Sequence, residues 1–151
     1  MFSWDTTLET GDALVDEQHR RIHRIFFDLA HAEDTPEEVM RILDRLTLHV
    51  SAHFATEEAL MERVRFPRAA AEIHRLEHAR LTDETRAYVV LFRQGELTTI
   101  EPLVDFLREW LVGHVHGFDR TLVDHCCARG TFAVVPDTWA AALAEQDPLA
   151  S

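Results

Sequence analysis

Residues 35–67, TPEEVMRILDRLTLHVSAHFATEEALMERVRFP, contain the pattern that decides the fold. Apolar side chains recur there every three or four residues, a spacing that places them on one face of an α-helix. That face consists of Val39, Leu43, Leu46, Val50, His53, Glu57 and Leu60. Because His53 and Glu57 occupy core positions of this face, the stretch predicts a long helix that buries an imidazole and a carboxylate.

Both ends of this helix carry recognisable signals. Thr35 can cap the first turn, Pro36 suits the first helical position, and Glu38 completes a capping box. Pro67 disfavours helical backbone at Phe66, so the helix should end before this pair.

Glycine and proline also separate three further helices, and no strand-like alternation competes with them. The expected helices run from about Asp16 to Ala32, from Pro67 to about Arg93, and from a Thr98–Glu101 capping box to about Cys127. Short connections favour antiparallel neighbours. The sequence therefore predicts an all-α protein, an antiparallel up-down four-helix bundle over residues 1–130 with a C-terminal extension over residues 131–151.

The extension should contain a short helix from Asp137 to Gln146. Its Trp139 and Leu143 are four residues apart, so both can dock on the bundle through one helix face. We interpret the extension as a cover for apolar surface.

Histidine lies on the apolar face of all four expected bundle helices. His19 is near the start of the first helix and His53 near the end of the second. His74 and His78 open the third, and His114 lies in the later half of the fourth. Since antiparallel neighbours bring the start of one helix beside the end of the next, these side chains can converge toward one end of the bundle.

Such a set of buried polar groups needs compensation. Removing one partner of a buried charge pair costs about 3–5 kcal/mol, whereas a whole domain is stable by only about 5–15 kcal/mol. Metal ions would neutralise the carboxylates and use the lone pairs of the histidines. The pattern therefore predicts a metal site within the bundle.

Composition excludes several other classes of function. The formal net charge of −12 argues against a nucleic-acid partner, because phosphate binding requires clustered basic residues. No stretch has the roughly 20 apolar residues that a membrane-spanning helix needs, and no signal peptide is visible. The adjacent Cys126 and Cys127 cannot easily form an ordinary disulfide. We interpret them as buried or idle thiols, with a redox-sensitive or intermolecular link as the alternative. We expect a cytoplasmic protein.

Four short segments resemble the ligand segments of the hemerythrin family, especially its bacterial single-domain members. They are Asp16-Glu17-Gln18-His19, His53-Phe54-Ala55-Thr56-Glu57-Glu58, His74-Arg75-Leu76-Glu77-His78 and His114-Val115-His116-Gly117-Phe118-Asp119. Trp4-Asp5 and Phe66-Pro67 are also similar to that family, and the resemblance covers roughly residues 2 to 126.

The resemblance implies two iron ions joined by a bridging oxo or hydroxo group. It implies that His74, His78 and His114 bind one iron, that His19 and His53 bind the other, and that Glu57 and Asp119 bridge the pair. Asp119 follows His114 by five residues, which is not a same-face helical spacing, so its assignment rests on the family pattern alone.

The implied function is reversible dioxygen binding, as an oxygen carrier, store, delivery protein or sensor rather than an enzyme. Three histidines and three bridging oxygens saturate one iron, whereas two histidines leave the other with an open position, the mark of a reactive site. Two alternatives remain open: a diiron enzyme acting on peroxide or nitric oxide or in iron-centre repair, and a structural module that holds zinc or no metal. We expect a monomer, with an oxygen-consuming enzyme as a candidate partner.

The remaining histidines carry less weight. His23 and His49 are four residues from His19 and His53, so either can support a ligand histidine, but we expect both on partly exposed helix flanks. We assign no ligand role to His116 or His125. Trp110, Leu111, Val115, Ile22 and Phe26 are candidate walls of a dry pocket, but each of them also suits an ordinary core.

Overall fold

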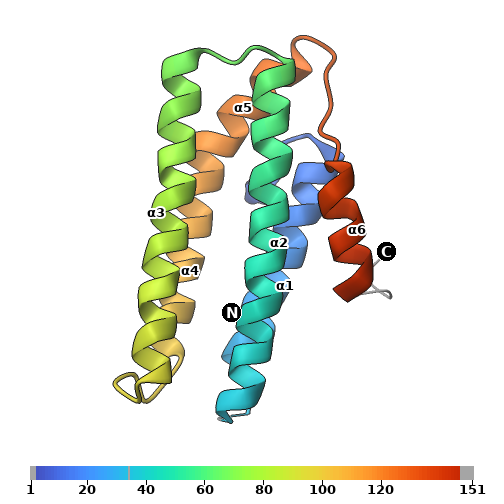
Figure 1. Ribbon diagram of the computed structural model, residues 1–151. Coiled ribbons are helices and arrows are strands. Elements are labelled where there is room, and N and C mark those ends of the chain that lie inside the picture. The colour runs from blue at the N-terminus through green and yellow to red at the C-terminus, as the bar shows by residue number, and fades with distance from the viewer. Residues whose placement is uncertain (1–2, 34, 147–151) are drawn as a thin grey trace.

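The computed structural model describes residues 3–33 and 35–146, and within these ranges every regular element is helical (Figure 1). A short 3₁₀ helix, η1, precedes the bundle, and α6 follows it. The elements are η1 (Thr6–Leu8), α1 (Ala13–Ala30), α2 (Pro36–Arg63), α3 (Arg68–Arg93), α4 (Glu101–His114), η2 (Val115–Asp119), α5 (Arg120–Cys127) and α6 (Asp137–Gln146).

The predicted all-α bundle is confirmed. In Figure 1, α1, α2, α3 and the combined rod of α4, η2 and α5 lie side by side with alternating direction. The start of α1, the end of α2, the start of α3 and the end of the fourth rod therefore share the upper end in that view. The division into a domain of residues 1–130 and an extension of residues 131–151 stays a prediction.

The first helix begins three residues earlier than expected because Asp12 caps it. Asp12 Oδ1 accepts hydrogen bonds from the backbone N–H groups of Leu14 and Val15, both at 3.0 Å. These two donors would otherwise lack a partner at the helix start. The cap fixes the N-terminal turn of α1, the helix that carries His19.

A tight reversal joins α2 to α3. Arg65 adopts a φ of 50°, in the left-handed region. Phe66 N–H donates to the Met61 carbonyl at 2.9 Å and Arg65 N–H to the Glu62 carbonyl at 3.2 Å. These two bonds form a Schellman motif, which terminates the helix and turns the chain back.

Both predicted capping boxes are wrong. Thr35 is the N-cap of α2, but its side chain makes no capping hydrogen bond. The fourth rod begins at Glu101 with Ile100 as its N-cap, so Thr98 lies outside the cap position. Proline in the first turn of each helix, Pro36 and Pro102, is compatible with these starts because proline needs no hydrogen-bond acceptor there.

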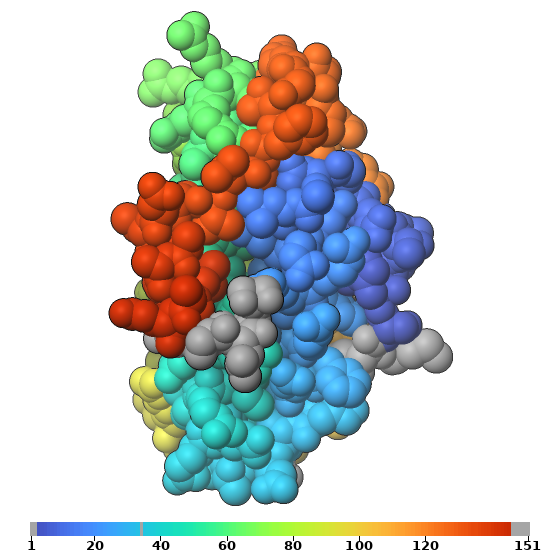
Figure 2. Space-filling model, turned by 90° about the vertical axis from the view of Figure 1, so that its right-hand side faces the viewer, coloured from blue at the N-terminus to red at the C-terminus, as the bar shows by residue number. Residues whose placement is uncertain are grey.

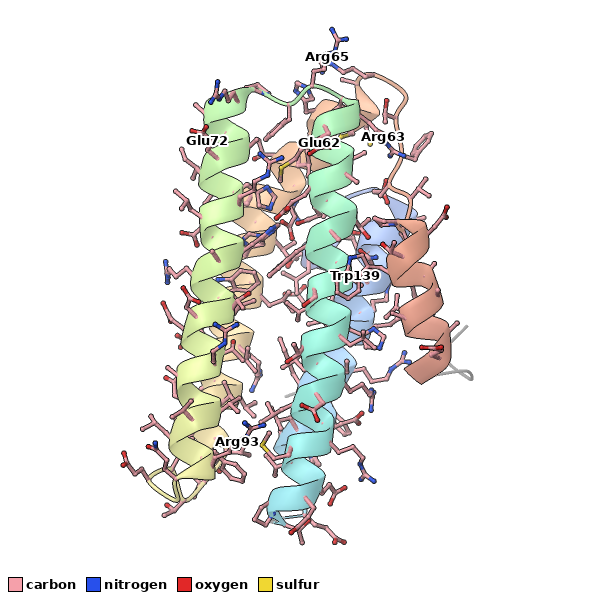
Figure 3. All side chains as sticks on the ribbon, viewed as in Figure 1. Glu62, Arg63, Arg65, Glu72, Arg93 and Trp139 are labelled. Carbon is pink, nitrogen blue, oxygen red and sulfur yellow. The ribbon has the colours of Figure 1, made fainter. Side chains whose placement is uncertain are left out.

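The C-terminal extension forms the expected helix and packs on the bundle. Figure 2 shows α6 against the surface formed by α1 and α2. In Figure 3, Trp139 projects from α6 toward α2, where it lines a groove with Arg45 and Leu48. Ala133 N–H donates to Asp12 Oδ2 at 2.9 Å, so the same buried carboxylate holds the start of α1 and the extension.

Within the described residues, no helix combines the length and apolar character that crossing a bilayer requires. Cys126 is buried, Cys127 is exposed, and both thiols are free. Burial raises the pKa of the Cys126 thiol to about 11, so this group stays protonated at neutral pH.

Asp12 offers a matched pair of variants that separates its two roles. Asp12→Asn keeps an oxygen able to cap α1 but replaces the acceptor of the Ala133 N–H, whereas Asp12→Ala removes both. Loss of a cap costs about 0.5–2 kcal/mol and a buried donor left unpaired about 1–3 kcal/mol. We expect Asp12→Ala to lose more stability than Asp12→Asn in urea unfolding, and both variants to expose the extension to faster proteolysis. Equal, wild-type cleavage rates in both variants would contradict the anchoring role.

Candidate metal centre

All seven predicted site residues come together in one buried cluster. They are His19 from α1, His53 and Glu57 from α2, His74 and His78 from α3, His114 at the end of α4 and Asp119 at the end of η2. None of the seven is more than 3% exposed. The cluster therefore has almost no contact with solvent.

The cluster lies between two separate apolar cores. The larger core includes Ile22, Leu81 and Leu111, and the smaller core includes Val15 and Leu122. Along every bundle rod, site residues fall between members of the two cores. Each helix thus carries an otherwise regular apolar face that is interrupted at the same level by polar groups.

The site divides into two groups that share both carboxylates. One contains the ligand atoms of Glu57, Asp119 and three histidines, His74, His78 and His114; the other contains the same two carboxylates with His19 and His53. Within each group, one potential ligand atom from each residue lies within 4.8 Å of all the others. Each group is therefore compact enough to surround one cation.

Each carboxylate directs one oxygen to each group. Glu57 Oε2 lies 3.3 Å from His74 Nε2 and 3.0 Å from His78 Nε2, and Glu57 Oε1 lies 3.4 Å from His53 Nε2. Asp119 Oδ1 lies 2.8 Å from His114 Nε2 and 3.0 Å from His74 Nε2. Asp119 Oδ2 lies 2.9 Å from His19 Nε2. This is the arrangement that two bridging carboxylates require.

A π-helical turn explains how Asp119 reaches the site. η2, over Val115–Asp119, is π-helical, and i→i+5 hydrogen bonds of this kind bring residues five apart onto one face. His114 and Asp119 are five apart, and their side chains touch. Regular α-helical periodicity could not have selected Asp119, because the irregularity of the backbone is what places it.

The donor set fits a pair of cations. Among the described residues, Glu57 Oε1 and Oε2, Asp119 Oδ1 and His78 Nε2 are buried atoms without a hydrogen bond of good geometry. Buried polar atoms in this state are rare in proteins, and a bound ion can satisfy them. Imidazole nitrogen with carboxylate oxygen suits iron or zinc better than calcium or magnesium.

The carboxylates are held in their charged form. Burial raises the pKa of Asp119, but the imidazoles of His114, His19, His53 and His74 outweigh it and hold this pKa well below its ordinary value. Burial and the neighbouring Asp119 likewise raise the pKa of Glu57, and the surrounding histidines lower it to about 2. Both groups are anionic at neutral pH.

The histidines respond to the same charges in the opposite sense. Burial lowers the pKa of His74, but the adjacent Asp119 and Glu57 outweigh burial and raise it to about 9. The pKa values of His19 and His78 are also raised by carboxylates despite burial. Burial dominates at His53, whose pKa is lowered. At neutral pH the imidazole of His74 is therefore protonated in the metal-free protein and helps to compensate the buried anions.

Several residues that support the site had no role assigned from the sequence. Gln18 Oε1 lies 2.8 Å from His53 Nδ1, and Glu58 Oε1 lies 3.3 Å from His78 Nδ1. Phe54 stacks on His78 at a ring-centroid distance of 3.7 Å. Gln18 and Glu58 are each next to a site residue in sequence, but only the rotation of the helices shows that they reach a histidine on another helix.

Two expectations about other residues can be compared with the structure. His49 is buried, so its expected exposure is wrong, whereas His23 is half-buried as expected. His116 is exposed. Trp110, a candidate pocket wall, stacks on His114 at a ring-centroid distance of 4.2 Å, so it contacts the site directly.

The bundle and its site define a class of protein: a four-helix metal-binding bundle with a buried histidine–carboxylate cluster. The family model of the Hemerythrin HHE cation binding domain matches residues 10–126. The chain belongs to the hemerythrin family.

The chain is also similar to several curated bacterial proteins. It is 34% identical over 125 residues to a bacteriohemerythrin of Pseudomonas aeruginosa, covering 80% of this chain and 78% of that protein. It is 32% identical over 123 residues to a bacteriohemerythrin of Stenotrophomonas maltophilia, covering 80% and 78%. A bacteriohemerythrin of Ralstonia nicotianae is 29% identical over 130 residues, covering 86% and 92%. The comparison with solved structures found no significant match.

The metal-free protein should lose stability as the pH rises. The pKa of His74 is about 9 in the folded state and 6.5 at its ordinary value, so its contribution is complete below pH 6.5 and lost as the pH rises through 9. Since one pKa unit corresponds to about 1.4 kcal/mol, the loss is on the order of 3 kcal/mol. Urea unfolding of chelator-treated protein between about pH 6 and about pH 10, an interval that spans both pKa values, measures this loss.

Metal-loaded protein provides the control for this measurement. Histidine ligands must be deprotonated, so metal binding strengthens as the pH rises over the same interval. Opposite slopes are expected for the two forms. A stability of the metal-free protein that rises from pH 6.5 to 9 would contradict the charge state described for His74.

Proposed function

We propose that this protein binds dioxygen reversibly at a non-haem diiron centre. The observation that carries the proposal is the division of the cluster into a three-histidine and a two-histidine group, each facing one oxygen of Glu57 and one of Asp119. Membership of the hemerythrin family and the names of the bacterial relatives support the same interpretation.

In this proposal His74, His78 and His114 hold one iron, and His19 and His53 hold the other. Glu57 and Asp119 bridge the two ions, together with an oxo or hydroxo group. Three histidines with three bridging oxygens fill six positions, whereas two histidines with the same bridges fill five. When bound, the iron pair would supply the electrons and the one open position that dioxygen binding requires.

The protein's own contribution is to hold the ligands rigidly and to exclude water. Leu111, Val115 and Ile22 belong to the larger apolar core beside the site, and each is at most 3% exposed. Trp110 and Phe54 stack on the imidazoles of His114 and His78. Because these apolar side chains exclude water, few protons reach the site. Protons would help reduced dioxygen to leave, so the apolar environment favours reversible binding.

Binding is favoured over oxidation by the kind of ligand. Diiron oxygenases and ferritin-like proteins use mostly carboxylates, in Glu-x-x-His pairs. Five neutral imidazoles and two carboxylates stabilise strongly oxidised iron less well. We place the protein in the cytoplasm as a monomer, acting as an oxygen carrier, store, delivery protein or sensor, with an oxygen-consuming enzyme as its candidate partner.

Exposure of the anaerobic ferrous protein to air tests the proposal directly. We expect a visible absorption band that forms with dioxygen, disappears on deoxygenation and returns over repeated cycles. Stopped-flow mixing with air, peroxide or nitric oxide in the presence of reductant separates binding from turnover. Continuous consumption of any of these substrates, without a reversible band, would replace the proposal by the diiron enzyme.

Iron content tests the bridging role of Glu57. Glu57→Ala should lower bound iron from a pair to at most one loosely held ion per chain, because both groups lose an oxygen. Glu62→Ala is the matched control, since Glu62 lies on the same helix but is exposed and pairs only loosely with Arg75, at 3.8 Å (Figure 3). Full iron occupancy in Glu57→Ala, measured by elemental analysis, would contradict the bridge.

A further inference from the structure

One histidine of the two-histidine group has a hydrogen-bond partner whose orientation can be deduced. Thr56 Oγ1 donates to the Ala52 carbonyl at 2.8 Å, which uses its only hydrogen. It lies 3.0 Å from the Gln18 side-chain amide, so it must accept there, and the Gln18 Nε2 group donates. The Gln18 Oε1 atom therefore faces His53.

This orientation fixes the tautomer of His53. Gln18 Oε1 lies 2.8 Å from His53 Nδ1, and an amide oxygen can only accept a hydrogen bond. Nδ1 must then carry the proton, and neutral His53 presents the Nε2 lone pair to Glu57 and the rest of the site. That is the tautomer that binds a cation through Nε2.

The corresponding partner in the three-histidine group is charged. His78 Nδ1 lies 3.3 Å from Oε1 of the Glu58 carboxylate. A carboxylate polarises the ring N–H more strongly than a neutral amide and makes the opposite nitrogen a stronger donor. The two groups therefore differ in the charge behind one histidine as well as in histidine number.

The C-terminal extension lies beside Gln18 and shares a cavity with it. Gln18 lines a cavity of about 180 Å³ whose other walls include His49 and Ala52 from α2 and Val135 and Leu143 from the extension. The extension lies beyond the segment that the family model matches.

We infer that Gln18 is a positioning residue that holds His53 in its metal-binding tautomer. The inference has a second part, which rests on the proposed function. Because Gln18 is neutral, the metal ion at the two-histidine group is less stabilised in its higher oxidation state than a carboxylate at this position would make it. Gln18 thus protects the reduced centre against oxidation by air.

Histidine-selective ¹⁵N NMR of the full chain loaded with zinc tests the first part, because zinc accepts these ligands and is diamagnetic. We expect a slowly exchanging Nδ1–H resonance for His53. In Gln18→Leu this proton should exchange with water at least about tenfold faster, and one zinc ion of the pair should bind about 10- to 100-fold more weakly, as is typical when such a partner is removed. A proton on Nε2 in the wild type, or equal weakening of both ions, would overturn the inference.

Two further variants make the result specific. Glu58→Gln is the matched control and should weaken the ion at the other group while leaving the His53 resonance unchanged. Gln18→Glu keeps the size of the side chain and an oxygen that can accept from His53 Nδ1. It therefore tests the inference even if Gln18→Leu does not fold. In Gln18→Glu the His53 Nδ1–H resonance should move downfield, and the diferrous protein should be oxidised by air about tenfold faster or more. If the His53 resonance does not move in Gln18→Glu and this variant is oxidised at the wild-type rate, the second part of the inference, which depends on the neutral charge of Gln18, is refuted.

The outcomes distinguish this inference from the proposed function. If the zinc protein shows the Nδ1–H and Gln18→Leu loses it, but the iron protein forms no reversible oxygen band, the positioning role stands and dioxygen binding does not. If the band forms but the wild type lacks the Nδ1–H, dioxygen binding stands and the role of Gln18 is refuted.

Discussion

Two carboxylates without solvent exposure, Glu57 and Asp119, impose the constraint on which the rest of the structure depends. A buried, unpaired charge costs several kcal/mol, which is a large part of the stability of a small domain. Five imidazoles surround these anions, and contacts with the carboxylates raise the pKa values of three of them, His19, His74 and His78. Protons and metal ions therefore compete for the same ligand atoms, and either can stabilise the buried anions.

This constraint shapes the helices as well as the site. Each bundle rod buries an apolar face that is interrupted at one level, and the two apolar cores fill the space on either side of the interruption. The fourth rod meets the constraint through its backbone, because the π-helical turn η2 gives up regular hydrogen bonding to bring Asp119 beside His114. π-helical turns of this kind occur mostly at functional sites. The turn ties the ligand geometry to the backbone rather than to a flexible side chain.

Contacts made by the first residues of α1 and by its N-cap connect the metal site with the C-terminal extension. Asp12 holds both the first turn of α1 and the extension, and α1 carries Gln18 and His19 at neighbouring positions. Gln18 in turn contacts His53 on α2. A segment outside the matched family region thus borders the supports of the two-histidine group, whereas the three-histidine group is supported by Glu58 near the surface. The two halves of the site therefore lie in different surroundings.

The sequence by itself determined the helical class, the direction of the helices and the histidines on their inner faces, because periodicity and helix-end signals are local properties of the chain. It also predicted the short helix of the extension. The start of the fourth rod was not predictable, because Ile100 has no side chain that can cap a helix. The start of α1 was missed although Asp12 is a residue type that caps helices through local hydrogen bonds. The resemblance to hemerythrins supplied Asp119, whose five-residue spacing has no meaning on a regular helix. Only the tertiary structure decided that the two oxygens of each carboxylate face different histidines. It also decided that Gln18 reaches His53 and that Glu58 reaches His78. These contacts depend on how separate helices are rotated against one another, which no local pattern in the sequence encodes.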